Sequence, residues 1–137
     1  MIITTKGRYA LYAMIALAKL EEGERVPLKD ITAGQDLSLK YMESIMTVLS
    51  KGGLVESASG KGGGYKLTRK PKEYSVGEIL RLAEGNISPV SCQALDGKEC
   101  DHEGSCITLP FWRELEDLIN DYLDKHSLYD LVHMSKA

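Results

Sequence analysis

Three cysteines lie within fifteen residues of this 137-residue chain, at Cys92, Cys100 and Cys106, and the sequence holds no others. Thiolates are soft ligands that suit Zn²⁺ and iron–sulfur clusters. The spacing Cys-x7-Cys-x5-Cys contains none of the short knuckles that are typical of zinc sites, so an iron–sulfur cluster is favoured over zinc. A disulfide would leave one thiol unpaired. A closed cluster site needs a fourth ligand, for which His102 is the first local candidate. The other nearby oxygen donors are Glu99, Asp101 and Glu103.

Composition points to a globular protein in a reducing compartment. The hydrophobic fraction is 43%. The longest nearly unbroken apolar run, residues 10–18, is far shorter than the roughly 20 residues that a membrane-spanning helix needs. It also lacks the pattern of a cleaved signal peptide. We therefore expect a cytoplasmic protein without a membrane partner, in which an odd number of free cysteines is tolerated.

Charge is divided unevenly along the chain, although the formal net charge is only −3. Residues 1–72 hold 12 Lys and Arg against 7 Asp and Glu, a net charge of +5. Residues 73–137 hold 5 against 13, a net charge of −8. A basic first half and an acidic second half fit a protein that turns one side toward phosphates. A chance division of charge is the alternative reading.

The basic half has the pattern of a helix-turn-helix followed by a hairpin. Thr5 is the expected cap of a first helix over residues 8–20, and a short helix follows at residues 28–33. After a turn at residues 34–37, Ser38 is the expected cap of a third helix over residues 39–50. Two short strands, residues 54–57 and 65–68, flank a glycine-rich tip at residues 60–64. A hairpin in this place is a wing, unless it is a plain surface loop.

The acidic half is predicted to be helical around the cysteines. Ser75 and Glu78 form an expected capping box for a helix that Gly85 closes. A long polar segment then carries the cysteines, and such a loop needs a clip to be ordered. A final long helix begins near Thr108 or Pro110, and a short one follows Ser127. The long helix bears an apolar stripe that must pack on its own domain, on a partner, or on both.

DNA readout requires polar side chains at the start of a helix that enters the major groove, and the third helix offers them. Lys40 suits a phosphate or a guanine, and Glu43 suits a cytosine amino group. Tyr41 is equally compatible with the core and with a DNA contact. The full set of candidate DNA-binding residues is Thr5, Lys6, Arg8, Ser38, Lys40, Tyr41, Glu43, Ser44, Gly60, Lys61, Gly62, Gly63 and Gly64. Enzyme motifs are missing from the sequence: there is no nucleophile elbow, P-loop or HExxH.

Five motifs together resemble the BadM-type winged-helix transcriptional regulators, the family that includes IscR, NsrR, RirA and CymR. They are TKGRYA at residues 5–10, SLKYME at 38–43, GGLV at 52–55, GKGGGYKL at 60–67 and SLYDL at 127–131. The wing motif is the most specific, and the resemblance covers nearly the whole chain. It is strongest to the iron–sulfur regulator IscR, because the three cysteines look like the cluster ligands of that member.

The resemblance implies a homodimeric, non-enzymatic DNA-binding regulator, expected to be a repressor, that reads a pseudo-palindromic operator. It places Tyr41 and Glu43 on the recognition helix and the wing in the minor groove. It implies a dimer interface formed by Trp112, Leu115, Ile119, Tyr122 and Leu123. It also implies an iron–sulfur cluster at the cysteines, with 2Fe-2S favoured over 4Fe-4S, that senses cluster status, oxygen or nitric oxide. Cluster-assembly proteins are further candidate partners.

The chain departs from those relatives around the cluster. The position at which IscR has a ligating histidine, three residues after the last cysteine, is Leu109 here. The region that supplies an aspartate in NsrR has Arg8. The first gap between cysteines is also longer than in IscR. Three alternatives stay open: a thiol-redox or zinc-responsive DNA-binding regulator, a regulator that senses through a protein partner as CymR does, and an interaction module that binds DNA weakly.

The predicted fold is therefore mainly α with a small β-hairpin. Its parts are a winged helix-turn-helix region at residues 1–72 and a connecting helix with an extended segment at 73–90. A cluster loop follows at 91–106, and a dimerisation helix with a short final helix occupies 107–137.

Overall fold

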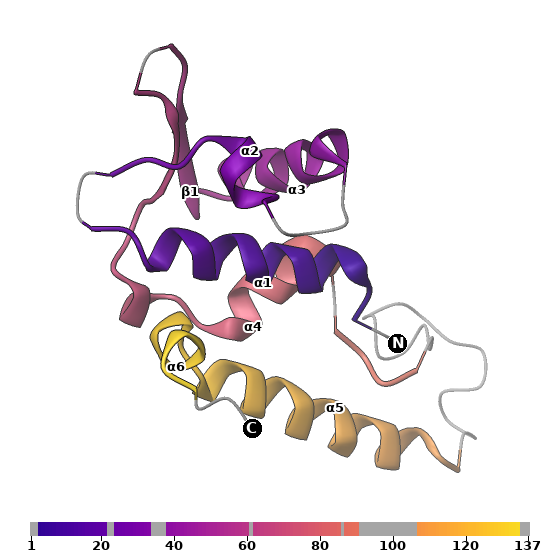
Figure 1. Ribbon diagram of the computed structural model, residues 1–137. Helices are drawn as coiled ribbons and strands as arrows, with labels where there is room; N and C mark the ends of the chain where they lie inside the picture. Colours follow the sequence, from indigo (N-terminus) through magenta and orange to yellow (C-terminus); the bar gives the residue numbers. More distant parts are fainter. Residues whose placement is uncertain are drawn as a thin grey trace.

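The computed structural model describes residues 3–21, 24–33, 38–60, 62–85, 87–90 and 107–134 (Figure 1). Within these residues the chain is mostly helical, with one two-stranded antiparallel sheet. The elements in chain order are α1 (Thr5–Ala18), α2 (Leu28–Ile31), α3 (Leu39–Lys51), β1 (Val55–Ala58), β2 (Gly64–Leu67), the 3-10 turn η1 (Pro71–Glu73), α4 (Val76–Glu84), α5 (Leu109–Lys125) and α6 (Leu128–Val132). The expected mainly helical class with a hairpin is confirmed.

Helix α1 lies at the centre of the fold and packs on α3, α4 and α6. Its buried Met14 and Leu17 meet the buried side of α3, where Met42 and Ile45 are almost completely enclosed. Figure 1 shows α3 and the hairpin on one side of α1, and α5 on the opposite side beyond α4. This arrangement separates α3 and the hairpin from the long C-terminal helix.

Local capping chemistry explains where most helices begin. The Ser38 hydroxyl accepts from the amide of Tyr41 at 3.0 Å, and Ser127 accepts from the amide of Asp130 at 3.0 Å. Gly85 ends α4 with a φ of 84°, a conformation that glycine adopts without strain. All three residues were predicted to bound their helices from their types alone.

Two capping predictions need correction. Helix α1 is capped by Thr4, whose hydroxyl accepts from the Lys6 amide, and it ends at Ala18, short of the expected Leu20. The predicted capping box at Ser75 is half formed, because Ser75 accepts from the Glu78 amide while the Glu78 carboxylate binds Arg69. A competing charged partner from a distant segment therefore outweighs the local cap.

The hairpin is present in the register that the expected strands imply, with both strands lying one residue closer to the tip. Val55 pairs with Leu67 and Ala58 pairs with Gly64. Strand β2 has a second partner as well, because Val26 and Tyr65 exchange backbone hydrogen bonds of 3.0 and 2.8 Å. The wing is thus tied to the segment that leads into α2.

Helix α5 uses one side for its own chain. Ile119 and Leu123 pack against a small buried cluster of Val76, Leu80 and Ile87. Arg81 of α4 also donates to Asn120 at 2.8 Å and binds Asp124. No helix in the described part of the chain is long and apolar enough to cross a membrane.

Candidate nucleic-acid interface

The first turns of α3 present an exposed polar surface. Lys40, Glu43 and Ser44 are all exposed, as is the capping residue Ser38. The Ser44 hydroxyl donates to the carbonyl of Tyr41 at 2.7 Å, which keeps it close to the helix backbone. Lys40 and Glu43 make no ion pair within the described residues. Both are therefore available to a molecule that approaches this end of α3.

Tyr41 packs between α3 and α1. The sequence left open whether this residue belongs to the core or contacts DNA. Its ring is half-buried and meets the ring of Tyr9 edge-on at a centroid distance of 6.2 Å. Its hydroxyl lies 3.2 Å from the hydroxyl of Thr5. The side chain therefore packs in the domain with its polar end at the surface, so a contact with DNA would involve that end.

The start of α1 carries the three other candidate contacts. Thr5, Lys6 and Arg8 are all exposed. A helix N-terminus ordinarily attracts anions, but here the carboxylate of Glu84 already binds the backbone amide and the hydroxyl of Thr4. A phosphate at this end would meet that negative charge, whereas Lys6 and Arg8 are exposed cations in the first turn of the helix.

Glycines shape the wing. Gly60 and Gly62 both have positive φ, at 86° and 77°, and both are exposed near the tip. Gly64 has a φ of 133°, and a Cβ there would lie 2.5 Å from the backbone of Val26. Only glycine fits at position 64, because of that close approach. Gly63 is half-buried behind the tip. Lys61 lies outside the described residues, so its predicted contact with DNA stays a prediction.

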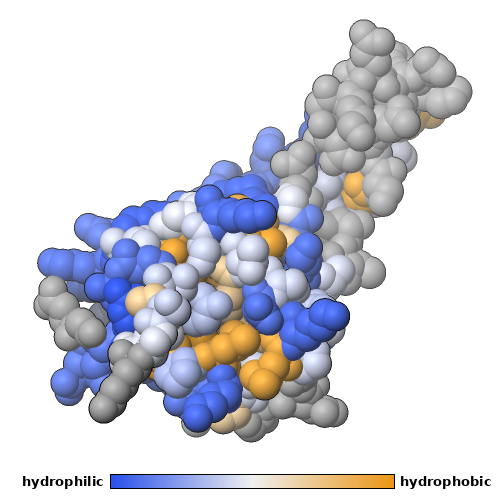
Figure 2. Space-filling model, turned by 90° about the horizontal axis from the view of Figure 1, so that it is seen from above, coloured by the Kyte–Doolittle hydropathy of each residue, from blue (hydrophilic) through white to orange (hydrophobic). Residues whose placement is uncertain are grey.

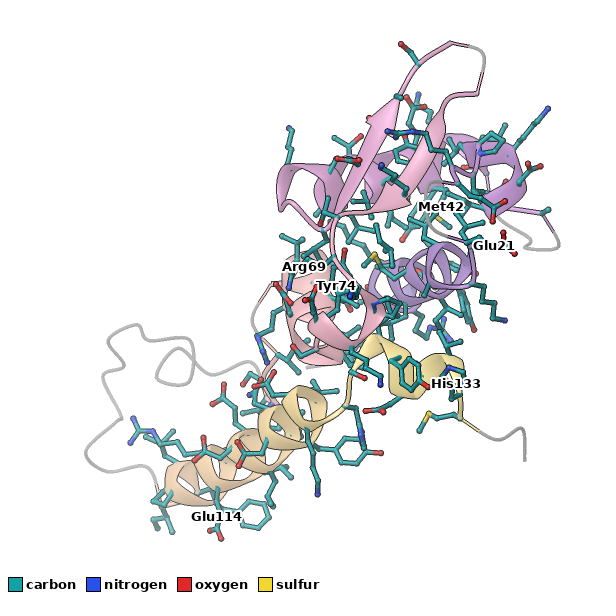
Figure 3. All side chains as sticks on the ribbon, turned by 90° about the vertical axis from the view of Figure 1, so that its left-hand side faces the viewer. Glu21, Met42, Arg69, Tyr74, Glu114 and His133 are labelled. Carbon is teal, nitrogen blue, oxygen red and sulfur yellow. The ribbon has the colours of Figure 1, made fainter. Side chains whose placement is uncertain are left out.

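A tyrosine anchors the base of the wing to the end of α3. Tyr74 is 1% exposed, and its hydroxyl donates to the Leu54 carbonyl at 2.7 Å. The same oxygen accepts from the amides of Thr68 and Arg69 at 3.0 and 2.9 Å. Figure 3 shows Tyr74 beside Arg69, whose guanidinium lies 4.4 Å from the centre of the tyrosine ring. This cluster fixes the direction in which the hairpin leaves the domain.

The electrostatics of the wing base reinforce that anchor. Arg69 donates to both carboxylate oxygens of Glu78, at 2.6 and 3.1 Å. The hydrogen bond to Glu78 raises the pKa of Arg69 above its ordinary value. Arg69 therefore stays a cation that is paired within the domain rather than a free cation at the base of the wing. Lys66 is likewise paired, at 3.1 Å from Glu56.

The surface seen from the hairpin side is largely hydrophilic. Figure 2 shows hydrophilic residues spread over this side around a smaller hydrophobic area.

The predicted cluster ligands Cys92, Cys100, Cys106 and His102 all lie outside the described residues. Within the ranges that the structure does describe, no three His, Cys, Asp or Glu side chains gather as a metal site. Leu109 is 3% exposed at the first position of α5, so neither its chemistry nor its burial suits a ligand.

The predicted dimer stripe on α5 is divided between two sides. Trp112 and Leu115 are half-buried, whereas Ile119 and Leu123 pack against α4 in the same chain. Tyr122 is 57% exposed. Two further residues, Phe111 at 60% and Leu118 at 63%, are exposed on α5 and were not in the predicted interface. Both belong to the apolar stripe that the sequence predicts, and their i, i+7 and i+11 spacing with Tyr122 places the three on one exposed side.

Sequence reasoning also missed Glu84 and the role of Tyr74. Both act through partners distant in sequence, since Glu84 binds Thr4 eighty residues away and Tyr74 binds Leu54 twenty away. Neither has a local motif that would have singled it out.

Comparison with known proteins matches nearly the whole chain to one group of regulators. The model of the family described as "Rrf2: Iron-dependent Transcriptional regulator" matches residues 3–134. The HTH-type transcriptional regulator IscR of Pectobacterium carotovorum is 38% identical over 133 residues, which cover 97% of this chain and 80% of that protein. IscR of Escherichia coli is also 38% identical, over 97% of this chain and 81% of its own length.

Two solved structures have the same fold. CymR, the global cysteine regulator of B. subtilis, superposes with a TM-score of 0.80 at 34% identity, covering 99% of both chains. IscR of T. potens superposes with a TM-score of 0.76 at 32% identity, covering 100% of this chain and 94% of that one. The expected kinship with IscR and CymR is thereby confirmed, and the relatives are regulators, as the absence of enzyme motifs predicted.

Proposed function

The chain belongs to the Rrf2 family of transcriptional regulators, and from that premise we propose that it is a dimeric, sequence-specific DNA-binding repressor controlled by an iron–sulfur cluster. The observation that carries the DNA-binding part is the exposed polar start of α3 on the same side of the domain as the hairpin (Figure 1). Such an arrangement suits a helix in the major groove and a wing beside it.

DNA contacts divide into two classes in this proposal. Lys40 and Glu43 stand where base edges would be read, and Glu43 is the residue that discriminates between sequences. Lys6, Arg8 and the wing-tip Lys61 contact phosphates, which give affinity but carry no sequence information. Tyr41 stands apart from both classes, because its ring packs in the domain and only its hydroxyl is offered to DNA.

A second copy of the chain completes the site. A dimer with two-fold symmetry presents two α3 helices to two half-sites, so it reads a pseudo-palindromic operator. Phe111, Leu118 and Tyr122 supply the exposed apolar surface on α5, and Trp112 and Leu115 adjoin it. Ile119 and Leu123 support the helix from behind through α4.

Cys92, Cys100 and Cys106 would hold the cluster, because three thiols in one short segment are a donor set suited to iron. His102 is the nearest candidate for the fourth ligand. When bound, the cluster supplies a centre that responds to oxygen, nitric oxide or iron supply, and 2Fe-2S is the favoured form. The segment joins α4 to α5, so ligation there bears on the two helices that connect the DNA-binding and dimer surfaces. A DNA-binding regulator with reduced thiols acts in the cytoplasm, where cluster-assembly proteins could load it.

The test of the cluster is purification without oxygen, followed by visible absorption and by iron and sulfide analysis. We expect charge-transfer bands and matched iron and sulfide, and their loss in Cys92→Ser, Cys100→Ser and Cys106→Ser. Leu109→Ala is the matched control and should keep the colour. A colourless protein that resists anaerobic reconstitution would refute cluster sensing and favour a thiol, zinc or protein-partner signal.

The test of DNA binding is selection of duplexes from a random pool, followed by affinity measurements at several salt concentrations. We expect an inverted-repeat sequence to be enriched, with a steep dependence of affinity on salt because phosphate contacts release counterions. Enrichment of no sequence would contradict specific recognition.

A further inference from the structure

The end of α4 holds the start of α1 through a single carboxylate. Glu84, the last residue of α4, accepts from the backbone amide of Thr4 and from its hydroxyl, the latter at 2.6 Å. The first turn of α1 contains no acidic residue, so Glu84 supplies the negative charge that a helix N-terminus favours. Gly7 leaves room for this contact, because a Cβ there would lie 2.9 Å from Cγ of Glu84.

The next residue of α1 holds the start of α3. The Thr5 hydroxyl lies 3.2 Å from the Tyr41 hydroxyl, and Tyr9, one turn further along α1, meets the Tyr41 ring edge-on. The backbone of Tyr41 is fixed in turn, since its amide donates to Ser38 and its carbonyl accepts from Ser44. Two consecutive threonines therefore connect α4 to the first turn of α3.

We propose that Glu84 is a positioning residue for DNA recognition: by holding Thr4 it sets the place of Thr5 and Tyr41, and so the angle at which α3 presents Lys40 and Glu43. The proposal rests on the proposed DNA-binding function and deepens it. Glu84 acts through Thr4 and Tyr41 and makes no contact with DNA.

Through α4, Glu84 also links the C-terminal helix α5 to α3. Arg81, one turn before Glu84, binds Asn120 and Asp124 of α5. The amide of Asn120 donates to the Ile87 carbonyl at 3.4 Å, just after the end of α4. A displacement of α5 against α4 thus moves the turn that carries Glu84. Coupling between sites requires such a contiguous element that both sites bias.

A purely structural cap would lower stability and affect every DNA sequence equally. A positioning residue would instead change the ratio of affinities for the selected and a scrambled duplex. Glu84→Ala also removes a negative charge near Lys6 and Arg8, which raises affinity for both duplexes alike, so the ratio isolates positioning from charge.

The experiment measures the affinity of the full-length protein for its selected duplex and for a scrambled duplex of the same composition. Glu84→Ala should lower the ratio about twofold to thirtyfold, the range seen for residues along a coupling network. Glu84→Gln keeps the size and one acceptor oxygen, so it should fold even if the alanine variant does not, and should lower the ratio less. Ser127→Ala, which removes the α6 cap, is the control that lowers stability and leaves the ratio unchanged.

A double-mutant cycle with Tyr41→Phe decides whether Glu84 acts through Tyr41. The two residues make no direct contact, so independent effects would add to within experimental error. We expect the ratio of affinities for the selected and scrambled duplexes to be no lower in the double variant than in the single variant with the lower ratio. Additive losses, or Glu84 variants with an unchanged ratio, overturn the positioning role while the wild-type preference for the selected duplex stands. A wild-type protein without that preference would instead refute the DNA-binding proposal, and the positioning role with it.

Discussion

Removing the hydroxyl of Tyr74 tests whether the wing base is held as the structure indicates. In Tyr74→Phe the ring remains, and so does the stacking of Arg69 over it at 4.4 Å. What disappears is one oxygen that serves three backbone groups, the carbonyl of Leu54 and the amides of Thr68 and Arg69.

The expected loss follows from what those groups retain. The Thr68 amide and the Leu54 carbonyl still face each other at 3.4 Å, so each keeps a weak partner. The Arg69 amide keeps none within the described residues. An unsatisfied buried donor costs about 1–3 kcal/mol, so we expect the free energy of unfolding to fall by about 2 kcal/mol. For a chain of this length that loss corresponds to about 6–10 °C in Tm.

Urea unfolding followed by circular dichroism measures this loss, at one fixed protein concentration because a dimer's stability depends on concentration. Tyr65→Phe is the matched control: Tyr65 is half-buried in β2, and its hydroxyl has no hydrogen-bond partner among the described residues. Its loss should stay within about 0.5 kcal/mol. Equal losses in the two variants would refute the assignment of the wing base to the Tyr74 hydroxyl.

Three further predictions concern recognition, assembly and pH. Glu43→Ala should change which sequences are preferred more than overall affinity, since Glu43 is exposed where bases would be read; equal losses on selected and scrambled duplexes would contradict that role. Leu118→Glu places a charge on the exposed apolar side of α5 and should shift the protein toward monomer in sedimentation, whereas Glu114→Gln on the same helix should not; an intact dimer would exclude this surface. The backbone amide of Ser127 holds the pKa of Asp130 below its usual 3.8, so Asp130 adds stability above that pH and loses it as pH falls through the lowered value. Asp130→Asn should therefore destabilise the protein most at neutral pH and least in acid, and a pH-independent difference in unfolding free energy would argue against it.

Several boundaries of the fold could be read from single residues. Ser38, Ser127 and Gly85 end or begin helices where predicted, because a cap depends on groups within one turn of chain. The glycine-rich hairpin was likewise evident with its register, although both strands lie one residue closer to the tip than expected. These features need no information about distant parts of the molecule.

Predictions failed where a distant residue competed with a local one. Thr4 was not chosen as the cap of α1, since its place is secured by Glu84 eighty residues away. Glu78 was expected to complete a capping box and instead pairs with Arg69 from the wing base. In each case the energy of a charged partner that only the fold brings near decides between two reasonable local arrangements.

The candidate site shows the same division. The exposed polar positions on α3 could be predicted from residue types, whereas the packing of Tyr41 on α1 could not, because aromatic residues suit the core and the interface equally. The apolar stripe of α5 was also evident from its spacing. Its division into a side packed on α4 and an exposed side was not, because periodicity gives the width of an apolar side but not what covers it.

The sequence by itself determined the helices and several of their caps, the wing, the three-thiol donor set and the family. The tertiary structure alone decided that Tyr74 anchors the wing, that Glu84 of α4 binds Thr4 at the start of α1, and that α5 leaves Phe111, Leu118 and Tyr122 exposed. The physical reason is the distance along the chain over which each kind of interaction acts. Propensity, capping and periodicity act within about a turn or two of helix, whereas these contacts depend on how the packed helices bring residues together across the fold.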